Sequence, residues 1–381
     1  MITEYIIIKN KKELDYLKNI NLKNKKIIFL YPNCFDNRLK NITTNVRDIL
    51  NQEDHYQILK KVIFVKKKFI NELSKNNNLN DANKANLRHF FLKTISSLFY
   101  LLKLLNKIQK LYIYKSHKWQ KVKSEKKTIN ELLKDIYFNK RLIDLGVPNV
   151  RRENFLEEKL NKIILFLIKK KKIVMCSNYN YNFKKISIDL YKKKKIICIS
   201  LDSKKNFLIN FLNNMVKIFN PLKKDIFLNF RPYIVKTYKL ENEIKSLISK
   251  LNNKEINYYN FGINKILANA VNYQNEIIPF TKNLFNILNV QLYISNHTRG
   301  IISPVIAMVS KENKIKSILI PHGTLSHNKN KFINELMKEV AMGFVDDNFS
   351  SQIICQSKIT ENFLNSNFPK KIYKKFNPIM W

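Results

Sequence analysis

The sequence predicts an α/β fold built on a parallel sheet. Short apolar runs recur along the chain, and segments with helical periodicity separate them, which is the alternation typical of α/β proteins. Residues 291–324 show this most clearly, because an apolar run, a polar turn, an amphipathic segment and a second apolar run follow one another directly. Two apolar runs also come just after lysine clusters, as expected where a helix ends and a strand begins.

The strand candidates are short apolar runs rich in isoleucine. In chain order they are residues 5–8, 27–31, 111–114, 173–176, 196–200, 292–295, 315–320 and 353–355. Between the runs at 292–295 and 315–320, residues 301–311 are predicted to be a helix with one apolar face. We therefore expect these two strands to be parallel neighbours, joined by a right-handed crossover.

Two regions are predicted to be mainly helical. In residues 56–108, a polar linker at 75–84 precedes apolar residues spaced three and four apart, which predicts a helical insertion. Its apolar face either packs on the sheet or lies at a membrane interface. Residues 238–288 are the second region, and we expect its boundaries at Pro221, Pro232 and Pro279.

The net charge of +41 comes with an excess of Lys, Asn and Ile, a composition that an AT-rich genome produces. Only eight of the 70 basic residues are Arg, although Arg is the usual reader of phosphates and bases. The lysine runs 169–172 and 192–195 are interpreted as helix ends on the sheet edge opposite a ligand crevice. A basic membrane-facing surface or a nucleic-acid groove are the alternatives.

Several classes of protein are disfavoured by what the sequence lacks. Its five glycines form no dinucleotide-binding or P-loop motif, and no nucleophile elbow or metal-ligand spacing occurs. We expect no signal peptide and no membrane span. The cysteines are far apart, which predicts reduced thiols of a cytoplasmic protein; they are Cys34, Cys176, Cys198 and Cys355.

Polar turns follow the strands at 292–295 and 315–320 and contain the candidate functional residues. In the first turn, His297 and Arg299 could bind a phosphate or carboxylate, and Asn296 could bind substrate. The alternative is a capping turn, with Asn296 or Thr298 as the helix cap. Both turns are expected at one rim of the sheet, because the carboxyl ends of parallel strands share an edge.

The second turn, Pro-His-Gly-Thr, contains the strongest catalytic candidate. His322 could act as a base or donate to a phosphate, Gly323 allows close approach of the backbone, and Thr324 adds a hydroxyl. A histidine bonded to a backbone carbonyl is the structural alternative. Asp346 and Asp347 could pair as acid and base, although adjacent acids in a loop are usually solvated.

Residues 290–381 resemble a known enzyme family. A strand ending in His-Gly-Thr, with an Asn-His turn one βαβ unit earlier, resembles bacterial surface-polysaccharide glycosyltransferases of the GT-B type and the related teichoic-acid glycerophosphotransferases. Residues 344–347, 353–357, 358–364 and the turn Phe376-Asn377-Pro378 resemble the start of that family's second domain. Phe376 replaces the usual glycine, and the tryptophan that precedes His-Gly-Thr in the glycerophosphotransferases is missing.

The resemblance implies a GT-B-like fold with two Rossmann-like lobes. Residues 1–325 would form the acceptor-side lobe, and residues 326–381 would begin an incomplete nucleotide-sugar-binding lobe. It also implies transfer of a sugar from a nucleotide-sugar to a surface-polysaccharide or lipid-linked acceptor, with His322 catalytic. From the missing motifs, we expect no metal and no other cofactor. We expect no nucleic-acid partner and peripheral association with the inner face of an anionic plasma membrane. The alternatives are a glycerophosphotransferase and a basic membrane-binding or nucleic-acid-binding scaffold without catalysis.

Overall fold

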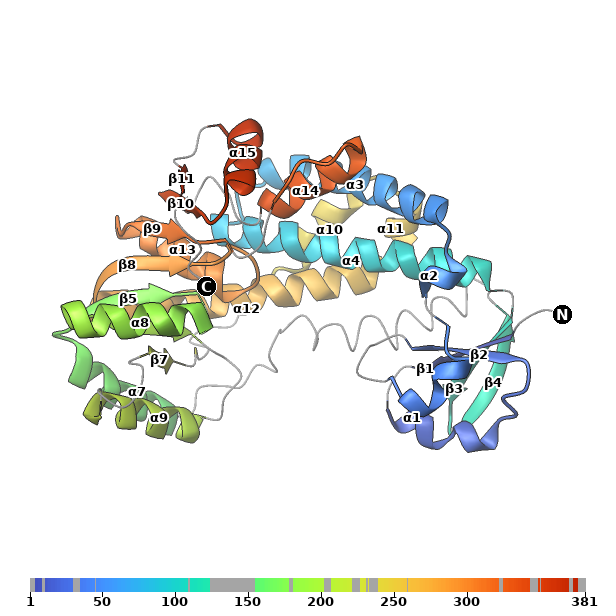
Figure 1. Cartoon of the computed structure of the whole chain (residues 1–381), viewed down its shortest axis with the longest axis horizontal. Coiled ribbons are helices and arrows are strands. Elements are labelled where there is room, and N and C mark those ends of the chain that lie inside the picture. Colours follow the sequence, from blue (N-terminus) through green and yellow to red (C-terminus); the bar gives the residue numbers. More distant parts are fainter. Residues whose placement is uncertain are drawn as a thin grey trace. The chain divides into compact units, whose positions relative to one another are not determined.

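The computed structural model describes most of the chain (Figure 1). The described residues are 4–8, 11–29, 35–44, 46–108, 110–123, 155–177, 181–201, 207–220, 227–230, 232, 239–258, 260–321, 325–342, 349, 351–369 and 373–375. They form an α/β fold, as predicted from the alternation of apolar runs and helical segments.

The chain forms two compact units, each with a sheet of its own. The small-sheet unit comprises Met1–Phe69, Phe91–Leu145 and Ile248–Ile266, and the large-sheet unit comprises Ile70–Phe90, Gly146–Leu247 and Leu267–Trp381. This division does not coincide with the boundary expected near residue 325. The long helices α3 (Gln52–Ser74), α4 (Asp81–Lys107) and α12 (Asn260–Ile287) each contribute residues to both units, which no linker composition reveals.

The small-sheet unit has a four-stranded sheet in the order β2-β1-β3-β4. Strand β1 (Glu4–Ile8) pairs in parallel with β2 (Lys25–Phe29) and β3 (Lys110–Lys115), and β4 (Lys118–Lys123) returns antiparallel to β3. Its core contains Ile6, Ile8, Leu17 and Ile27. The short helices of this unit are α1 (Lys12–Asp15), α2 (Val46–Ile49) and α11 (Lys254–Tyr258).

The large-sheet unit has a seven-stranded parallel sheet in the order β11-β10-β9-β8-β5-β6-β7. The strands are β5 (Lys172–Cys176), β6 (Ile197–Leu201), β7 (Phe227–Phe230), β8 (Asn289–Ser295), β9 (Ser317–Leu319), β10 (Gln352–Cys355) and β11 (Tyr373–Lys375). Helix α7 (Phe155–Ile168) precedes β5. Besides α12, the helices between the strands include α8 (Tyr181–Lys194), α9 (Phe207–Phe219), α10 (Glu241–Ser249), α13 (Ile302–Glu312), α14 (Lys331–Met342) and α15 (Lys358–Asn367).

The apolar runs predicted to be strands supply many of the residues of the sheet core. One cluster contains Val174, Cys176, Cys198, Phe227 and Ile294. A second cluster is formed by buried residues that include those of β9, β10 and α15. The three described cysteines are free and buried, whereas Cys34 lies outside the described residues. Strand β10, which the resemblance places at the start of a second lobe, pairs with β9 in the same sheet as β8, and β11 pairs with β10.

All predicted strands are present, and the predicted pairing of β8 with β9 is confirmed. The apolar face of α4 is buried at Ile95, Leu98 and Leu105, as expected for a packed helix. One boundary was wrong, because Pro279 lies inside α12. Proline inside a helix costs about 3 kcal/mol, and the burial of Ile277 and Phe280 on either side offsets that cost. Pro221 lies outside the described residues.

One of the two lysine runs lies in the last turn of a helix, and the other follows a helix whose last turn contains no basic residue. Helix α7 ends at Ile168, directly before Lys169, and the last turn of α8 contains Lys192, Lys193 and Lys194. Among the described residues, no helix is both long and apolar enough to cross a bilayer.

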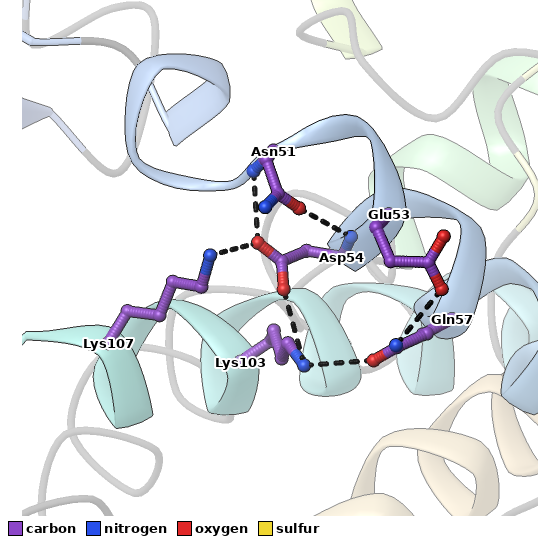
Figure 2. A network of polar contacts seen from close by, with 6 residues as sticks. All are labelled: Asn51, Glu53, Asp54, Gln57, Lys103 and Lys107. Carbon is purple, nitrogen blue, oxygen red and sulfur yellow. Dashed lines mark hydrogen bonds and ion pairs between the residues drawn. The ribbon is translucent and has the colours of Figure 1, made fainter.

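A buried carboxylate joins α3 to α4 in the small-sheet unit (Figure 2). The carboxylate of Asp54 accepts from the Asn51 N–H, and the Asn51 side chain accepts from the Asp54 N–H, each at 2.9 Å. This reciprocal pairing caps the start of α3. From α4, Lys107 donates to the same carboxylate and Lys103 pairs with it at 3.3 Å. The hydrogen bond from Lys107 is the main cause that lowers the pKa of Asp54.

Asp54→Asn should destabilise the protein at neutral pH and much less in acid. Because folding lowers the pKa of Asp54, its stabilisation is complete above the unfolded value of about 3.9 and is lost as the pH falls through the native value. Urea denaturation gives the free energy of unfolding of both proteins. Asp54→Asn should differ from wild type in this free energy by less at about pH 3 than near neutral pH. Glu53→Gln, which removes the exposed charge beside it, is the control. An equal difference at both pH values would contradict this role.

Candidate functional site

The large sheet has a topological switch point between β5 and β8. From β5 the chain continues outward to β6 and β7, and from β8 it continues in the opposite direction to β9, β10 and β11. The connections that leave the carboxyl ends of β5 and β8 therefore diverge. In open α/β sheets, ligands bind in the crevice that such divergence opens.

A hydrogen bond joins the two connections at this point. Ser177 follows β5 directly and is fully buried, and Asn296 follows β8 and is almost fully buried. Ser177 Oγ donates to Asn296 Oδ1 at 3.2 Å, and the Ser177 N–H donates to the Ile294 carbonyl at 3.1 Å. The backbone on either side of the switch point is thereby held in one geometry.

The turn after β8 is fixed through the carbonyl of His297. Ser295 Oγ donates to this carbonyl at 3.0 Å, and Ser303 Oγ, from the first turn of α13, donates to it at 2.5 Å. The Arg299 N–H donates to His297 Nδ1 at 3.3 Å. Because Nδ1 accepts that bond, the neutral imidazole has its proton on Nε2. His297 is therefore arranged as a hydrogen-bond donor through Nε2.

A buried polar chain anchors the start of α13. Gln274 of α12 is fully buried and donates to the carbonyl of Ile301 at 3.0 Å. Its own side-chain oxygen accepts from Asn83 of α4 at 2.9 Å. Asn83 thereby fixes the orientation of the Gln274 amide, and Gln274 fixes the residue that precedes α13.

The first turn of α13 presents a positive environment. The Ncap residue is Ile301, and no side-chain hydrogen bond caps the helix there. The alternative prediction, that Asn296 or Thr298 is the Ncap residue, was therefore wrong. Gly300 has φ of +81°, a conformation that favours glycine and turns the chain from the strand into the helix. Burial lowers the pKa of Arg299, yet a guanidinium stays protonated at neutral pH. Positive charge beside a helix N-terminus favours an anion.

The second predicted turn begins at the same edge. The Ile320 N–H donates to the Ser295 carbonyl at 2.7 Å, and the Pro321 carbonyl accepts from Gln356 Nε2 at 2.8 Å. His322, Gly323 and Thr324 lie outside the described residues, as do Asp346 and Asp347. The structure thus brings Asn296, His297 and Arg299 together in one turn.

Sequence reasoning missed Ser177, Gln274 and Gln356. Ser177 and Gln356 follow the apolar runs of β5 and β10, a position that the sequence could have indicated. Gln274 carries no such signal, because it lies within a long helix far from the turn in sequence. Among the described residues, no group of three or more His, Cys, Asp or Glu side chains could hold a metal ion.

Searches of protein-family models, curated proteins and solved structures found no match to the chain.

Arg299→Met should weaken the binding of inorganic pyrophosphate. A hydrogen bond to a charged group contributes roughly 1.5–3 kcal/mol, which corresponds to a loss of about tenfold to a hundredfold in affinity. Titration calorimetry at low ionic strength measures this. Lys311→Met, which removes a cation from the other end of α13, is the matched control. Equal losses in both variants would mean that pyrophosphate is attracted by overall charge and not by this turn.

Proposed function

We propose that the protein is a glycosyltransferase that moves a sugar from a nucleotide-sugar donor to a surface-polysaccharide or lipid-linked acceptor. The observation that carries the proposal is the turn from Asn296 to Gly300. It follows β8 at the topological switch point and leads directly into α13. Switch points of this kind hold nucleotide ligands in open parallel sheets.

The charges of this turn suit the diphosphate of such a donor. The proposal therefore places the diphosphate within residues 1–325, and not in the lobe from residue 326 to which the family resemblance assigns the nucleotide-sugar. Arg299 supplies a permanent positive charge, and the first turn of α13 adds the positive end of the helix dipole. His297, with its proton on Nε2, can donate a further hydrogen bond to a phosphate or sugar oxygen. As the sugar leaves, negative charge grows on the diphosphate, and these groups stabilise that charge.

Transfer also requires a base. The acceptor hydroxyl loses its proton while its oxygen bonds to the anomeric carbon and the bond from that carbon to the diphosphate breaks. A histidine accepts a proton readily near neutral pH. The proposal gives this role to His322, with Gly323 and Thr324 binding substrate beside it. The support for His322 is the family resemblance of its Pro-His-Gly-Thr turn.

The same charges suit a glycerophosphotransferase, whose donor is a nucleotide-activated alcohol phosphate. Both donors contain a diphosphate, so Arg299 and α13 do not discriminate between them. Turnover measured in parallel with a panel of nucleotide-sugars and with nucleotide-activated glycerol separates the two reactions.

His322→Ala in the full-length protein should lower turnover by about a hundredfold or more, the range expected for loss of a general base. Donor affinity should change much less, because the base acts on the acceptor. Turnover and donor binding are measured separately. His327→Ala, which removes a histidine five residues later, is the control and should keep near wild-type turnover.

His322→Asn sharpens the test. Asparagine keeps a hydrogen-bond donor but has no basicity. Near wild-type turnover in His322→Asn together with a large loss in His322→Ala would make His322 a substrate ligand. Unchanged turnover in both variants would refute the assignment of His322.

A further inference from the structure

Helix α9 exposes a continuous apolar stripe. Leu208, Leu212, Val216 and Phe219 follow one another at helical spacing, with Ile209 beside them, and all five side chains are exposed. Leu212 is 61% exposed and Phe219 is 69% exposed, which is unusual for side chains of this size. Because the residues share one face of the helix, they form a patch and not scattered single exposures.

The opposite face of α9 is bonded to the edge of the sheet, so the helix does not have the freedom to turn its stripe inward. Strand β7 is an edge strand, and α9 lies beside it (Figure 1). Asn214 donates to the Asn229 carbonyl at 2.6 Å and accepts from the Asn229 N–H at 3.1 Å. Asn210 donates to the same carbonyl at 2.7 Å, and Lys217 donates to the Phe227 carbonyl at 2.8 Å.

These four bonds satisfy backbone groups of β7 that a further strand would otherwise pair. They protect the sheet edge against unwanted pairing. They also fix the rotation of α9 about its axis, because both asparagines must face β7. The exposure of the stripe is therefore a consequence of how the edge is covered.

Helix α7 packs against α9 and adds apolar residues and lysines. Leu156, Ile163 and Phe166 are exposed on α7, and Phe166 is 67% exposed. Exposed lysines lie among and after them, at Lys159, Lys162, Lys169, Lys170 and Lys171. Lys162 pairs with Glu158 of the same helix at 2.6 Å, so the lysines after α7 contribute most of the net positive charge. The Lys169 ammonium lies 4.4 Å from the centre of the Phe166 ring. The sequence of α9 contains no acidic residue.

An apolar stripe without acidic residues, bordered by lysines, is complementary to the interface of an anionic bilayer. Apolar side chains enter the boundary between headgroups and acyl chains, while lysines pair with anionic headgroups. A second copy of this chain fits less well, because the net charge of +41 and the exposed lysines would repel an identical surface. We propose that α7 and α9 form a docking face for anionic membrane, with α9 lying in the plane of the interface. This proposal does not depend on the glycosyltransferase activity.

The test is flotation with vesicles of phosphatidylcholine alone or with about one third phosphatidylglycerol. Wild type should partition onto the anionic vesicles at least about tenfold more strongly than onto the neutral ones. Leu212→Ser combined with Phe219→Ser should lower that partitioning about tenfold. Ile333→Ser combined with Ile359→Ser, which removes two exposed apolar side chains from α14 and α15, is the matched control and should change it less than about twofold.

A second comparison tests whether the lysines that follow α7 contribute to binding. Replacing Lys169, Lys170 and Lys171 with Gln should weaken binding more than the same change at Lys192, Lys193 and Lys194, although both remove the same charge. Equal partitioning of the two serine pairs would overturn the proposal and leave only general charge attraction. The proposal would also be overturned, in favour of a second copy as the occupant, by a different result. In that case wild type is a dimer in solution, whereas Leu212→Ser combined with Phe219→Ser is a monomer that binds vesicles as strongly as wild type. Circular dichroism confirms that each variant is folded.

Discussion

The large sheet depends on the pairing of β5 with β8, because the direction of chain progression reverses between these two strands. Their register contains one irregularity. Ile173 lies opposite Val290, but Val174 lies opposite Leu292, so Gln291 is an extra residue in β8. A bulge of this kind shifts every later residue of its strand by one position relative to its neighbour.

The turn from Asn296 to Gly300 is built on this shifted register. The shift brings Cys176 opposite Ile294, so that Ser177 meets the end of β8 and donates to Asn296. The turn then continues to Gly300, and Gln274 of α12 donates a hydrogen bond to the carbonyl of Ile301, the residue before α13. A change in the register at Gln291 would therefore move the Ser177 bond, the His297 turn and the start of α13 together. The candidate site is a product of strand pairing as much as of its own residues.

The elements that were predicted from the sequence have strong local patterns. Apolar runs in an otherwise Lys-rich and Asn-rich chain predicted the core strands, and three- and four-residue spacing predicted α4 and α13. Strands β4, β7 and β11 were missed. Strand β4 lacks the alternation of apolar and polar residues that marks a strand, because Trp119 and Val122 are three residues apart. Strand β7 contains Asn229, whose backbone pairs with side chains of α9 and not with a further strand. Interactions between residues that are far apart in the chain produce little recognisable pattern in the local sequence. For the candidate site, the sequence indicated Asn296, His297 and Arg299 by their position after a strand and could have indicated Ser177 in the same way, whereas Gln274 required the tertiary structure.

The proposed function requires that a nucleoside diphosphate binds at the switch point between β5 and β8. Hydrogen exchange of the full-length protein, with and without a saturating nucleotide-sugar, tests it most directly. Protection is predicted at Ser177 and at residues 296–303, with little change in β7, α9 or the small-sheet unit. Protection confined to the small-sheet unit, or binding without any protection of residues 296–303, would contradict the claim.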